Sequence, residues 1–250
     1  MKILVTGAAG MIGRKLTARL MNEGTGELIL HDIVSAGAGS IVSDFSMPGE
    51  AEKLVAARPD LIFHLAAIVS GEAEADFDKG YRINLDGTRR LFDAIRKVGG
   101  DYKPRVVFAS SIAVFGAPFP DAIGDEFVNA PLTSYGTQKT ICELLLSDYS
   151  RKGFFDGIGL RLPTICVRPG KPNLAASGFF SGIIREPLAG AEAVLPVSES
   201  VDNRVSSILF RESRSGCQLK IPTGKPTPFW MRSSIELNSL RPGFRAVLDS

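Results

Sequence analysis

Residues 3–13 read Ile-Leu-Val-Thr-Gly-Ala-Ala-Gly-Met-Ile-Gly, a run that predicts a buried strand, a glycine-rich turn and the first turn of a helix. Glycines at such a turn permit positive φ and the close approach of a ligand. The free N–H groups and the partial positive charge of a helix N-terminus suit a pyrophosphate. We therefore predict a dinucleotide site here, with a purely structural turn as the alternative. Its predicted contacts are Gly7, Gly10, Met11, Ile12 and Gly13.

Apolar runs separated by helical segments continue this pattern. Further strands are predicted at residues 28–32, 39–44, 61–67, 105–111 and 158–165, and helices at residues 50–58, 72–98 and from 133 onward. Strands that alternate with helices indicate an α/β protein with a Rossmann-type, doubly wound parallel sheet. We expect a dinucleotide-binding domain over residues 1–165 and a small, irregular C-terminal substrate lobe over residues 166–250. The regular pattern is lost from residue 201, and we expect flexible segments near residues 33–43 and 200–210 to be missing from the chain.

Polar and small residues follow the predicted strands. Asp32 ends the second strand, a little further from Gly7 than the usual ~20 residues, and is placed for a ribose diol, with a helix cap or turn as the alternative. Asp44 ends the third strand and is a candidate acceptor for the adenine amino group. Because Asp32 would repel the extra phosphate of NADP, and Ile33-Val34 supplies no arginine, we predict NAD rather than NADP.

Residues 133–139 read Thr-Ser-Tyr-Gly-Thr-Gln-Lys and place a phenol and an ammonium four residues apart on one face of a helix. A free tyrosine has a pKa of about 10, so it is a poor base at neutral pH unless nearby cations favour the phenolate. Lys139 supplies one cation and an oxidised nicotinamide ring a second. Tyr135 is thus a candidate proton acceptor, although Tyr-x-x-x-Lys also occurs by chance.

Ser110 and Ser111 end the predicted fifth strand, and the ends of strands are where such sheets keep their chemistry. A serine there can hydrogen-bond both the tyrosine and a substrate hydroxyl. A turn-forming serine is the alternative.

Composition narrows the class of protein. Apolar residues make up 44% and charged residues 22% of the 250 residues, which predicts a soluble globular protein with a proper core. A net charge of +2 gives no reason to expect nucleic acid or a membrane, and without a leader or an apolar span the chain is expected in the cytoplasm.

Cys142, Cys166 and Cys217 lack paired spacing and are predicted to be buried free thiols. His64 has no partner at ligand spacing, so we expect a core histidine and no metal site.

Several of these segments together resemble the extended short-chain dehydrogenase/reductases, the NAD-dependent epimerase/dehydratase family. The resemblance rests on residues 6–13, His64-Leu-Ala-Ala67, Asn84, residues 110–116 and residues 135–139. It implies NAD across the carboxyl ends of the strands, Tyr135 as base, Lys139 on the nicotinamide ribose and Ser111, rather than Ser110, aligning the substrate hydroxyl. Beyond the glycine-rich turn, the implied cofactor contacts are Asp32, Asp44, Leu65, Ala66, Ala67, Asn84, Tyr135, Lys139, Leu162 and Pro163. The family usually has a tyrosine where Phe115 stands.

Four further segments narrow the resemblance to family members that oxidise the C2 hydroxyl of a four-carbon sugar acid such as D-erythronate, giving a 2-oxo acid. These are residues 67–75, 131–135, 168–173 and 177–180. Ser70, Ser111, Tyr135 and Arg168 would then face the substrate, with a turn role for Ser70 and a surface ion pair for Arg168 as alternatives. We expect a homodimer. The competing functions are a nucleotide-sugar epimerase or dehydratase that keeps its NAD bound, and a non-enzymatic NAD-binding regulator.

Overall fold

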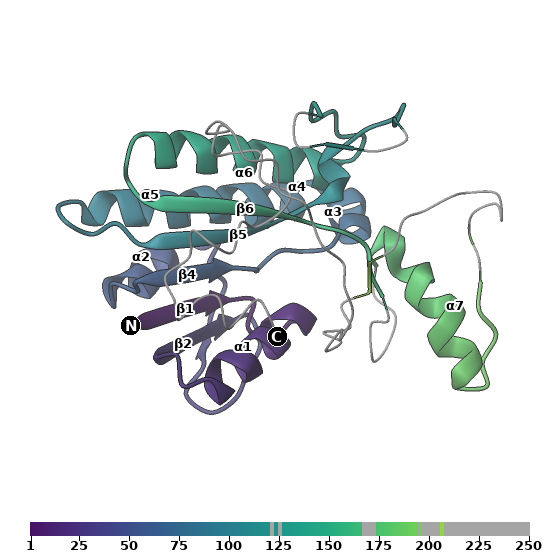
Figure 1. Cartoon of the computed structure of the whole chain (residues 1–250), viewed down its shortest axis with the longest axis horizontal. Helices are drawn as coiled ribbons and strands as arrows, with labels where there is room; N and C mark the ends of the chain where they lie inside the picture. The colour runs from purple at the N-terminus through teal and green to yellow at the C-terminus, as the bar shows by residue number, and fades with distance from the viewer. Residues whose placement is uncertain (121–122, 125–126, 167–173, 195, 197–205, 208–250) are drawn as a thin grey trace, which may run out of the picture.

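A six-stranded parallel sheet forms the centre of the protein in the computed structural model, which describes residues 1–120, 123–124, 127–166, 174–194, 196 and 206–207. The strand order is β3-β2-β1-β4-β5-β6, which confirms the predicted Rossmann-type sheet (Figure 1). The strands are β1 (Lys2–Thr6), β2 (Glu27–Asp32), β3 (Ile41–Val42), β4 (Leu61–His64), β5 (Arg105–Ser111) and β6 (Asp156–Leu162).

Helices cover both faces of this sheet (Figure 1). The main ones are α1 (Met11–Asn22), α2 (Glu50–Ala56), α5 (Thr88–Val98) and α6 (Ser134–Arg151). Leu4 and Ile62 pack into a core cluster with side chains of α2, α5 and α6, whereas Ile3 and Val5 pack into a second cluster on the α1 side. Successive strand residues point to opposite faces, so one short apolar run supplies both cores.

The predicted helix over residues 72–98 is wrong as a single element. The structure divides this stretch into α3 (Ser70–Ala75), α4 (Phe77–Gly80), a π-helix η1 (Tyr81–Gly87) and α5. Asp76 has a non-helical backbone, and its carboxylate accepts the N–H of Lys79, so it ends α3 and caps α4. The π-helix brings the side chain of Asn84 into the interior, where it is 1% exposed.

Three strands also end differently from the predictions. The fourth strand, predicted to reach Ala67, ends at His64. The third strand shrinks to Ile41–Val42, which pairs with His31 and Asp32 of β2. The sixth strand ends at Leu162, because Pro163 has no N–H to continue the ladder. A short strand β7 (Ile165–Cys166) follows and pairs with β8 (Ser206–Ser207) in a separate two-stranded sheet.

The remaining elements lie near the carboxyl ends of the strands (Figure 1). They are the 3₁₀ turns η2 (Ile112–Val114) and η3 (Ala176–Gly178) and the helix α7 (Phe179–Leu188). Gly71 packs closely on the backbone of Leu174, where an added Cβ would lie 2.0 Å from the carbonyl oxygen, so the segment before η3 sits against α3. Among the described residues no helix combines the length and apolarity needed to span a bilayer.

Candidate functional site

The glycine-rich turn joins β1 to α1 and touches the end of β4. Gly7 has φ +76°, and a Cβ on it would lie 2.7 Å from the amide nitrogen of Ala66. A Cβ on Gly13 would lie 2.1 Å from the carbonyl oxygen of Gly7. Gly10 is the N-cap of α1 and provides no side-chain acceptor, so the first N–H groups of this helix face a position suited to an anion. The turn therefore fits the pyrophosphate of a dinucleotide.

Asp32 lies beside the turn, at the carboxyl end of β2. Its Oδ2 accepts the N–H of Ala9 at 2.9 Å, and its Oδ1 accepts the N–H of Ile33 at 2.7 Å. These bonds fix the carboxylate against the loop, and each oxygen keeps a second lone pair for a ribose hydroxyl. The position fits the predicted role of Asp32.

Asp44 has protein partners that the sequence did not indicate. Its Oδ2 accepts from Arg82 at 2.8 Å, and its Oδ1 accepts from the backbone and hydroxyl of Ser46. Burial opposes ionisation, but the hydrogen bonds from Ser46 and Arg82 outweigh it and hold the pKa of Asp44 below its ordinary value. Asp44 is thus an oriented carboxylate, and its contact with adenine stays a prediction.

Leu65, Ala66 and Ala67 follow β4 as a half-buried loop held by Asn84. The Oδ1 of Asn84 accepts the N–H of Ile68 at 2.9 Å, and its Nδ2 donates to the Ile68 carbonyl (3.3 Å) and to the Oε1 of Gln138 (2.8 Å). Both amide hydrogens are therefore used inside the protein. The geometry supports a role for Asn84 in shaping the cofactor loop, and direct contact with the cofactor stays a prediction.

The start of α6 holds Tyr135. Thr133 is the N-cap, and its hydroxyl accepts the N–H of Gly136 at 3.0 Å. Glu74 of α3 accepts the N–H of Ser134 at 3.0 Å. The first turn of the helix is thereby fixed from within and from the neighbouring helix α3, which limits the positions open to the half-buried Tyr135.

Lys139 lies one turn further along α6 and is 3% exposed. Its Nζ donates to the carbonyl oxygen of Ala109 at 2.7 Å and lies 5.7 Å from the centre of the Tyr135 ring. An ammonium has three donors, so this bond leaves capacity for ligand hydroxyls. The structure thus brings the predicted phenol and ammonium together beside the end of β5.

Ser111 ends β5 and caps η2, its hydroxyl oxygen accepting the N–H of Ala113 at 3.1 Å. Ser111 therefore has the turn-forming role that was the alternative to a catalytic one. This role uses only the hydroxyl oxygen as an acceptor, so the O–H can still donate. Ser110 is 2% exposed and donates to Glu143, so its hydroxyl is committed to the interior. This supports the choice of Ser111 over Ser110. Leu162, a predicted cofactor contact, pairs with Ser111 in the ladder, and Pro163 follows it.

Sequence reasoning missed a cluster behind these residues, formed by Ser110, Asn129, Glu143 and Arg161. Two features of the sequence could have indicated this cluster. Glu143 follows Lys139 by four residues and so shares its helix face, and Arg161 directly precedes Leu162. Phe115 belongs here too, because the Arg161 guanidinium lies 4.9 Å from the centre of its ring.

His64 is a core histidine, as predicted. It is 1% exposed and hydrogen-bonds Thr6 (2.8 Å) and Thr88 (2.9 Å) through its two ring nitrogens. Burial, with smaller contributions from the charges of Lys139 and His31, lowers the pKa of His64 to about 3. The ring therefore stays neutral at physiological pH.

Cys142 is a buried free thiol, and burial raises its pKa to about 11. The described part of the chain contains no group of three His, Cys, Asp or Glu side chains that could hold a metal ion.

Ser70 starts α3 and is half-buried. Arg168, Cys217 and the side chain of Cys166 lie outside the described residues.

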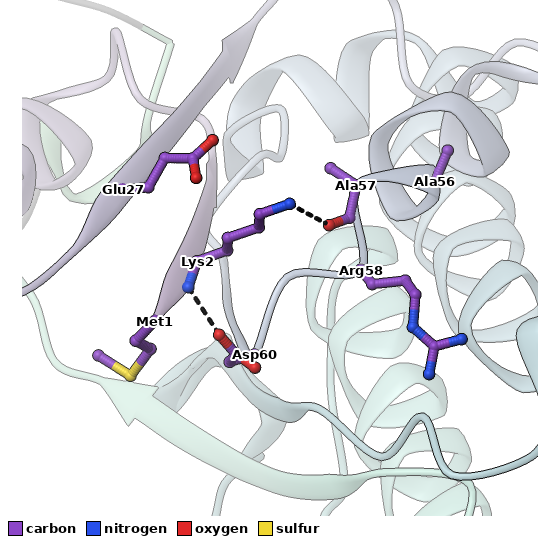
Figure 2. Close-up of a pocket in the computed structure, with 7 residues that line it drawn as sticks. All are labelled: Met1, Lys2, Glu27, Ala56, Ala57, Arg58 and Asp60. Carbon is purple, nitrogen blue, oxygen red and sulfur yellow. Dashed lines mark hydrogen bonds between the residues drawn. The ribbon is translucent and has the colours of Figure 1, made fainter.

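A hollow of about 610 Å³ lies at the opposite edge of the sheet, where the strands begin (Figure 2). Its lining groups are largely satisfied by one another: the backbone N–H of Lys2 donates to Asp60 (2.6 Å), and its Nζ donates to the carbonyl of Ala57 (3.2 Å). Arg58 pairs with Asp101 at 2.6 Å. The glycine-rich turn, Asp32 and Ser111 lie at the carboxyl ends of β1, β2 and β5, so this hollow is not part of the candidate site.

Comparison with known proteins agrees with this geometry. The model of the NAD dependent epimerase/dehydratase family matches residues 3–204. The chain belongs to this family. Within the epimerase/dehydratase family, the D-erythronate dehydrogenase of Cupriavidus necator is 48% identical over 214 residues, covering 79% of this chain and 65% of that protein. The D-erythronate dehydrogenase of Haemophilus influenzae is 46% identical over 217 residues, covering 83% of this chain and 68% of that protein. The chain thus spans about two thirds of the length of these relatives.

A solved structure with the epimerase/dehydratase fold is 69% identical in sequence to this chain and superimposes on it with a TM-score of 0.74. It is described as the nucleoside-diphosphate-sugar epimerase from Agrobacterium tumefaciens, and the match covers 80% of this chain and 63% of that one. The family resemblance predicted from the sequence is confirmed.

Proposed function

We propose that this protein is an NAD-dependent dehydrogenase that oxidises the C2 hydroxyl of a four-carbon sugar acid, with D-erythronate as the substrate. The observation that carries the proposal is the match to two D-erythronate dehydrogenases at 48% and 46% identity over about four fifths of the chain. The placement of Tyr135, Lys139 and Ser111 around the end of β5 supports it, since a protein that only binds NAD needs no proton relay.

In this proposal residues of the chain hold the cofactor and move the proton. The turn from Gly7 to Gly13 receives the pyrophosphate, Asp32 the adenosine ribose, and Lys139 the nicotinamide ribose. Bound NAD⁺ supplies the hydride acceptor. Ser111 donates to the C2 oxygen of the substrate, and Tyr135 as phenolate takes the hydroxyl proton while the hydride leaves C2. The products are a 2-oxo acid (2-oxo-tetronate) and NADH.

The substrate carboxylate needs a cation. Arg168 is the candidate, because a guanidinium can hold a carboxylate through two parallel hydrogen bonds. Ser70 at the start of α3 is proposed as a second substrate contact. The next residue, Gly71, packs on the backbone of Leu174, so the start of α3 lies beside the chain that leads into η3 and α7, which supports this.

A second candidate function is nucleotide-sugar epimerisation, in which NAD stays bound and is reoxidised in each cycle. It is favoured by the 69% identity to the structure described as a nucleoside-diphosphate-sugar epimerase. The two functions make opposite predictions about free NADH, which accumulates only when the reaction is a net oxidation.

The deciding assay follows NADH absorbance with a panel of C4 sugar acids, alongside a search for epimerised products from UDP-glucose and UDP-galactose. NADH from D-erythronate, with kcat/KM reduced by about tenfold or more in Arg168→Lys, is the expected result. Epimerised nucleotide sugar without NADH would refute the dehydrogenase and favour the second candidate.

We also propose a homodimer in the cytoplasm, with the NAD site over residues 1–165 and the substrate lobe over residues 166–250. Sedimentation at two protein concentrations tests the dimer.

A further inference from the structure

A nearly buried ion pair lies directly behind the candidate site. Glu143 of α6 and Arg161 of β6 have side chains that are 13% and 9% exposed. The Arg161 Nη2 donates to the Glu143 Oε2 at 2.9 Å, and its Nε donates to the Oε1 at 3.1 Å, a two-pronged contact.

Neighbouring side chains also hydrogen-bond this pair. Ser110 donates to the Oε1 of Glu143, and the Nδ2 of Asn129 donates to the Oε2 at 3.0 Å. The Arg161 Nη2 also donates to the Oδ1 of Asn129 at 3.0 Å. The ring of Phe115 lies against the guanidinium. The four polar residues Ser110, Asn129, Glu143 and Arg161, called here the Glu143 network, are joined to one another by these hydrogen bonds.

Three of the four members of the Glu143 network lie next to a proposed site residue. Ser110 precedes Ser111, Glu143 lies one helical turn after Lys139, and Arg161 precedes Leu162. In the ladder Ser110 pairs with Arg161, and Ser111 pairs with Leu162. The network therefore ties the three elements that carry the proton relay and one wall of the cofactor site: β5, α6 and β6.

The same network fixes both ends of the segment that runs from Ser111 to Tyr135. Phe115 stands near its start and Asn129 near its end, and both contact Arg161. The backbone closes the segment at the same place, because the N–H of Ala130 donates to the carbonyl of Val114 at 3.0 Å. The buried pair is thus one of the contacts that set the position of Ser111 relative to Tyr135.

The opposite ends of the same two strands provide a comparison. Arg105 at the start of β5 pairs with Asp156 at the start of β6, with Nε 2.7 Å from Oδ2. These side chains are 34% and 41% exposed and lie at the edge where the strands begin. Both ion pairs join β5 to β6, but only the buried one adjoins the proposed site.

We infer that Glu143 and Arg161 are positioning residues whose buried pair sets Ser111, Tyr135 and Lys139 in the geometry needed for NAD binding and proton transfer. The inference rests on the proposed function for the roles of those three residues. A misplacement of about 1 Å can cost about 10²-fold in rate, so a distant pair can control turnover without touching substrate.

The test compares three variants of the 250-residue chain with wild type. Glu143→Gln keeps the size of the side chain but loses its charge and one acceptor, and Arg161→Lys keeps the charge but loses the planar fork. Arg105→Gln/Asp156→Asn is the matched control on the same two strands. The measurements are the NADH dissociation constant by fluorescence, kcat and KM with D-erythronate, and the unfolding midpoint.

The expected result is that Glu143→Gln and Arg161→Lys weaken NADH binding or lower kcat by about fivefold or more in folded protein, while the control changes only the unfolding midpoint. Changes of less than about fivefold in both quantities would overturn the inference and leave the pair a structural one. Should the single changes prevent folding, Glu143→Met/Arg161→Met replaces them, because exchanging a whole buried pair for apolar residues is often neutral for stability.

The two proposals fail separately. Wild type that binds NADH but oxidises no C4 acid refutes the proposed substrate, and the NADH dissociation constants of the variants then decide the inference. Wild type that does oxidise D-erythronate, with variants that match it, refutes the inference alone.

Discussion

The Nζ of Lys139 lies 2.7 Å from the carbonyl oxygen of Ala109, two residues before Ser111 on β5. This bond fastens the ammonium to the strand that ends in the proposed catalytic serine. It also explains how a lysine can be 3% exposed, since the charge has a hydrogen-bond partner and lies 4.7 Å from the centre of the Phe108 ring.

Lys139→Met should therefore harm both NAD binding and turnover. The variant keeps the length of the side chain but removes the group proposed to hold the nicotinamide ribose and to favour the phenolate. We expect a loss of about 10²-fold or more in kcat/KM, together with a weaker NADH dissociation constant. Equal NADH affinity in Lys139→Met and wild type would remove Lys139 from the ribose.

Tyr135→Phe should separate chemistry from binding. The ring is retained, so the start of α6 and the cofactor contacts should persist, but no proton can be taken. We expect kcat to fall by about 10²-fold or more with NADH affinity unchanged. A variant that keeps more than about a tenth of the wild-type kcat would show that another group is the base.

Local patterns were the most predictable part of this protein. β5 was predicted at residues 105–111 and found there, because Pro104 precedes the strand and η2 follows it. Tyr135 and Lys139 were predicted to share a helix face because their spacing is a property of the helix itself. Gly7 and Gly13 could be predicted because few other residues permit such close backbone approach.

The remainder depended on contacts between distant segments. The apolar periodicity over residues 72–98 predicted one helix. It carries no information on Asp76, which ends one helix and whose carboxylate caps the next. Glu143 and Arg161 are separated by 18 residues. Their pairing follows from the register of β5 with β6 and from the packing of α6 against these strands. The ion pair between Asp44 and Arg82 was missed for the same reason.

NAD should be preferred over NADP by about tenfold or more in kcat/KM, which corresponds to about 1.4 kcal/mol. Asp32 is held against the glycine-rich turn by the N–H of Ala9 and would meet an added 2′-phosphate with like charge. Steady-state assays with both cofactors measure this. Equal values would point instead to Arg14, whose Nε donates to the Ala9 carbonyl at 2.7 Å.

Gly13→Ala should disrupt the glycine-rich turn. The added methyl group would lie 2.1 Å from the carbonyl oxygen of Gly7 and 2.7 Å from the Cα of Ala8, so the backbone must move. We expect NADH affinity to fall by about tenfold or more and the unfolding midpoint to drop. Gly124→Ala is the control, because a Cβ there meets nothing within 4 Å. Similar behaviour of the two variants would mean that the turn tolerates the shift.

His64 should make stability fall with acid before the carboxylates titrate. Its pKa is lowered in the folded protein to about 3, whereas in the unfolded chain it is about 6.5. Below about pH 6.5 the unfolded state binds a proton that the folded state excludes, so the stability due to neutral His64 is full above that pH and declines toward pH 3. For this one group, the slope of the free energy of unfolding against pH approaches about 1.4 kcal/mol per pH unit. His31, whose pKa is also lowered by burial, adds to it in the same direction.

Urea unfolding between about pH 7.5 and about pH 4.5 measures this slope, a range above most carboxylate pKa values. His64→Gln can keep hydrogen bonds to Thr6 and Thr88 but has no titrating group, so its free energy of unfolding should depend less on pH over this range. The two curves should converge as the pH falls, because wild type loses stability that the variant does not. Parallel curves for His64→Gln and wild type would mean that His64 takes up its proton equally in the folded and unfolded states, contrary to its burial between β1 and α5.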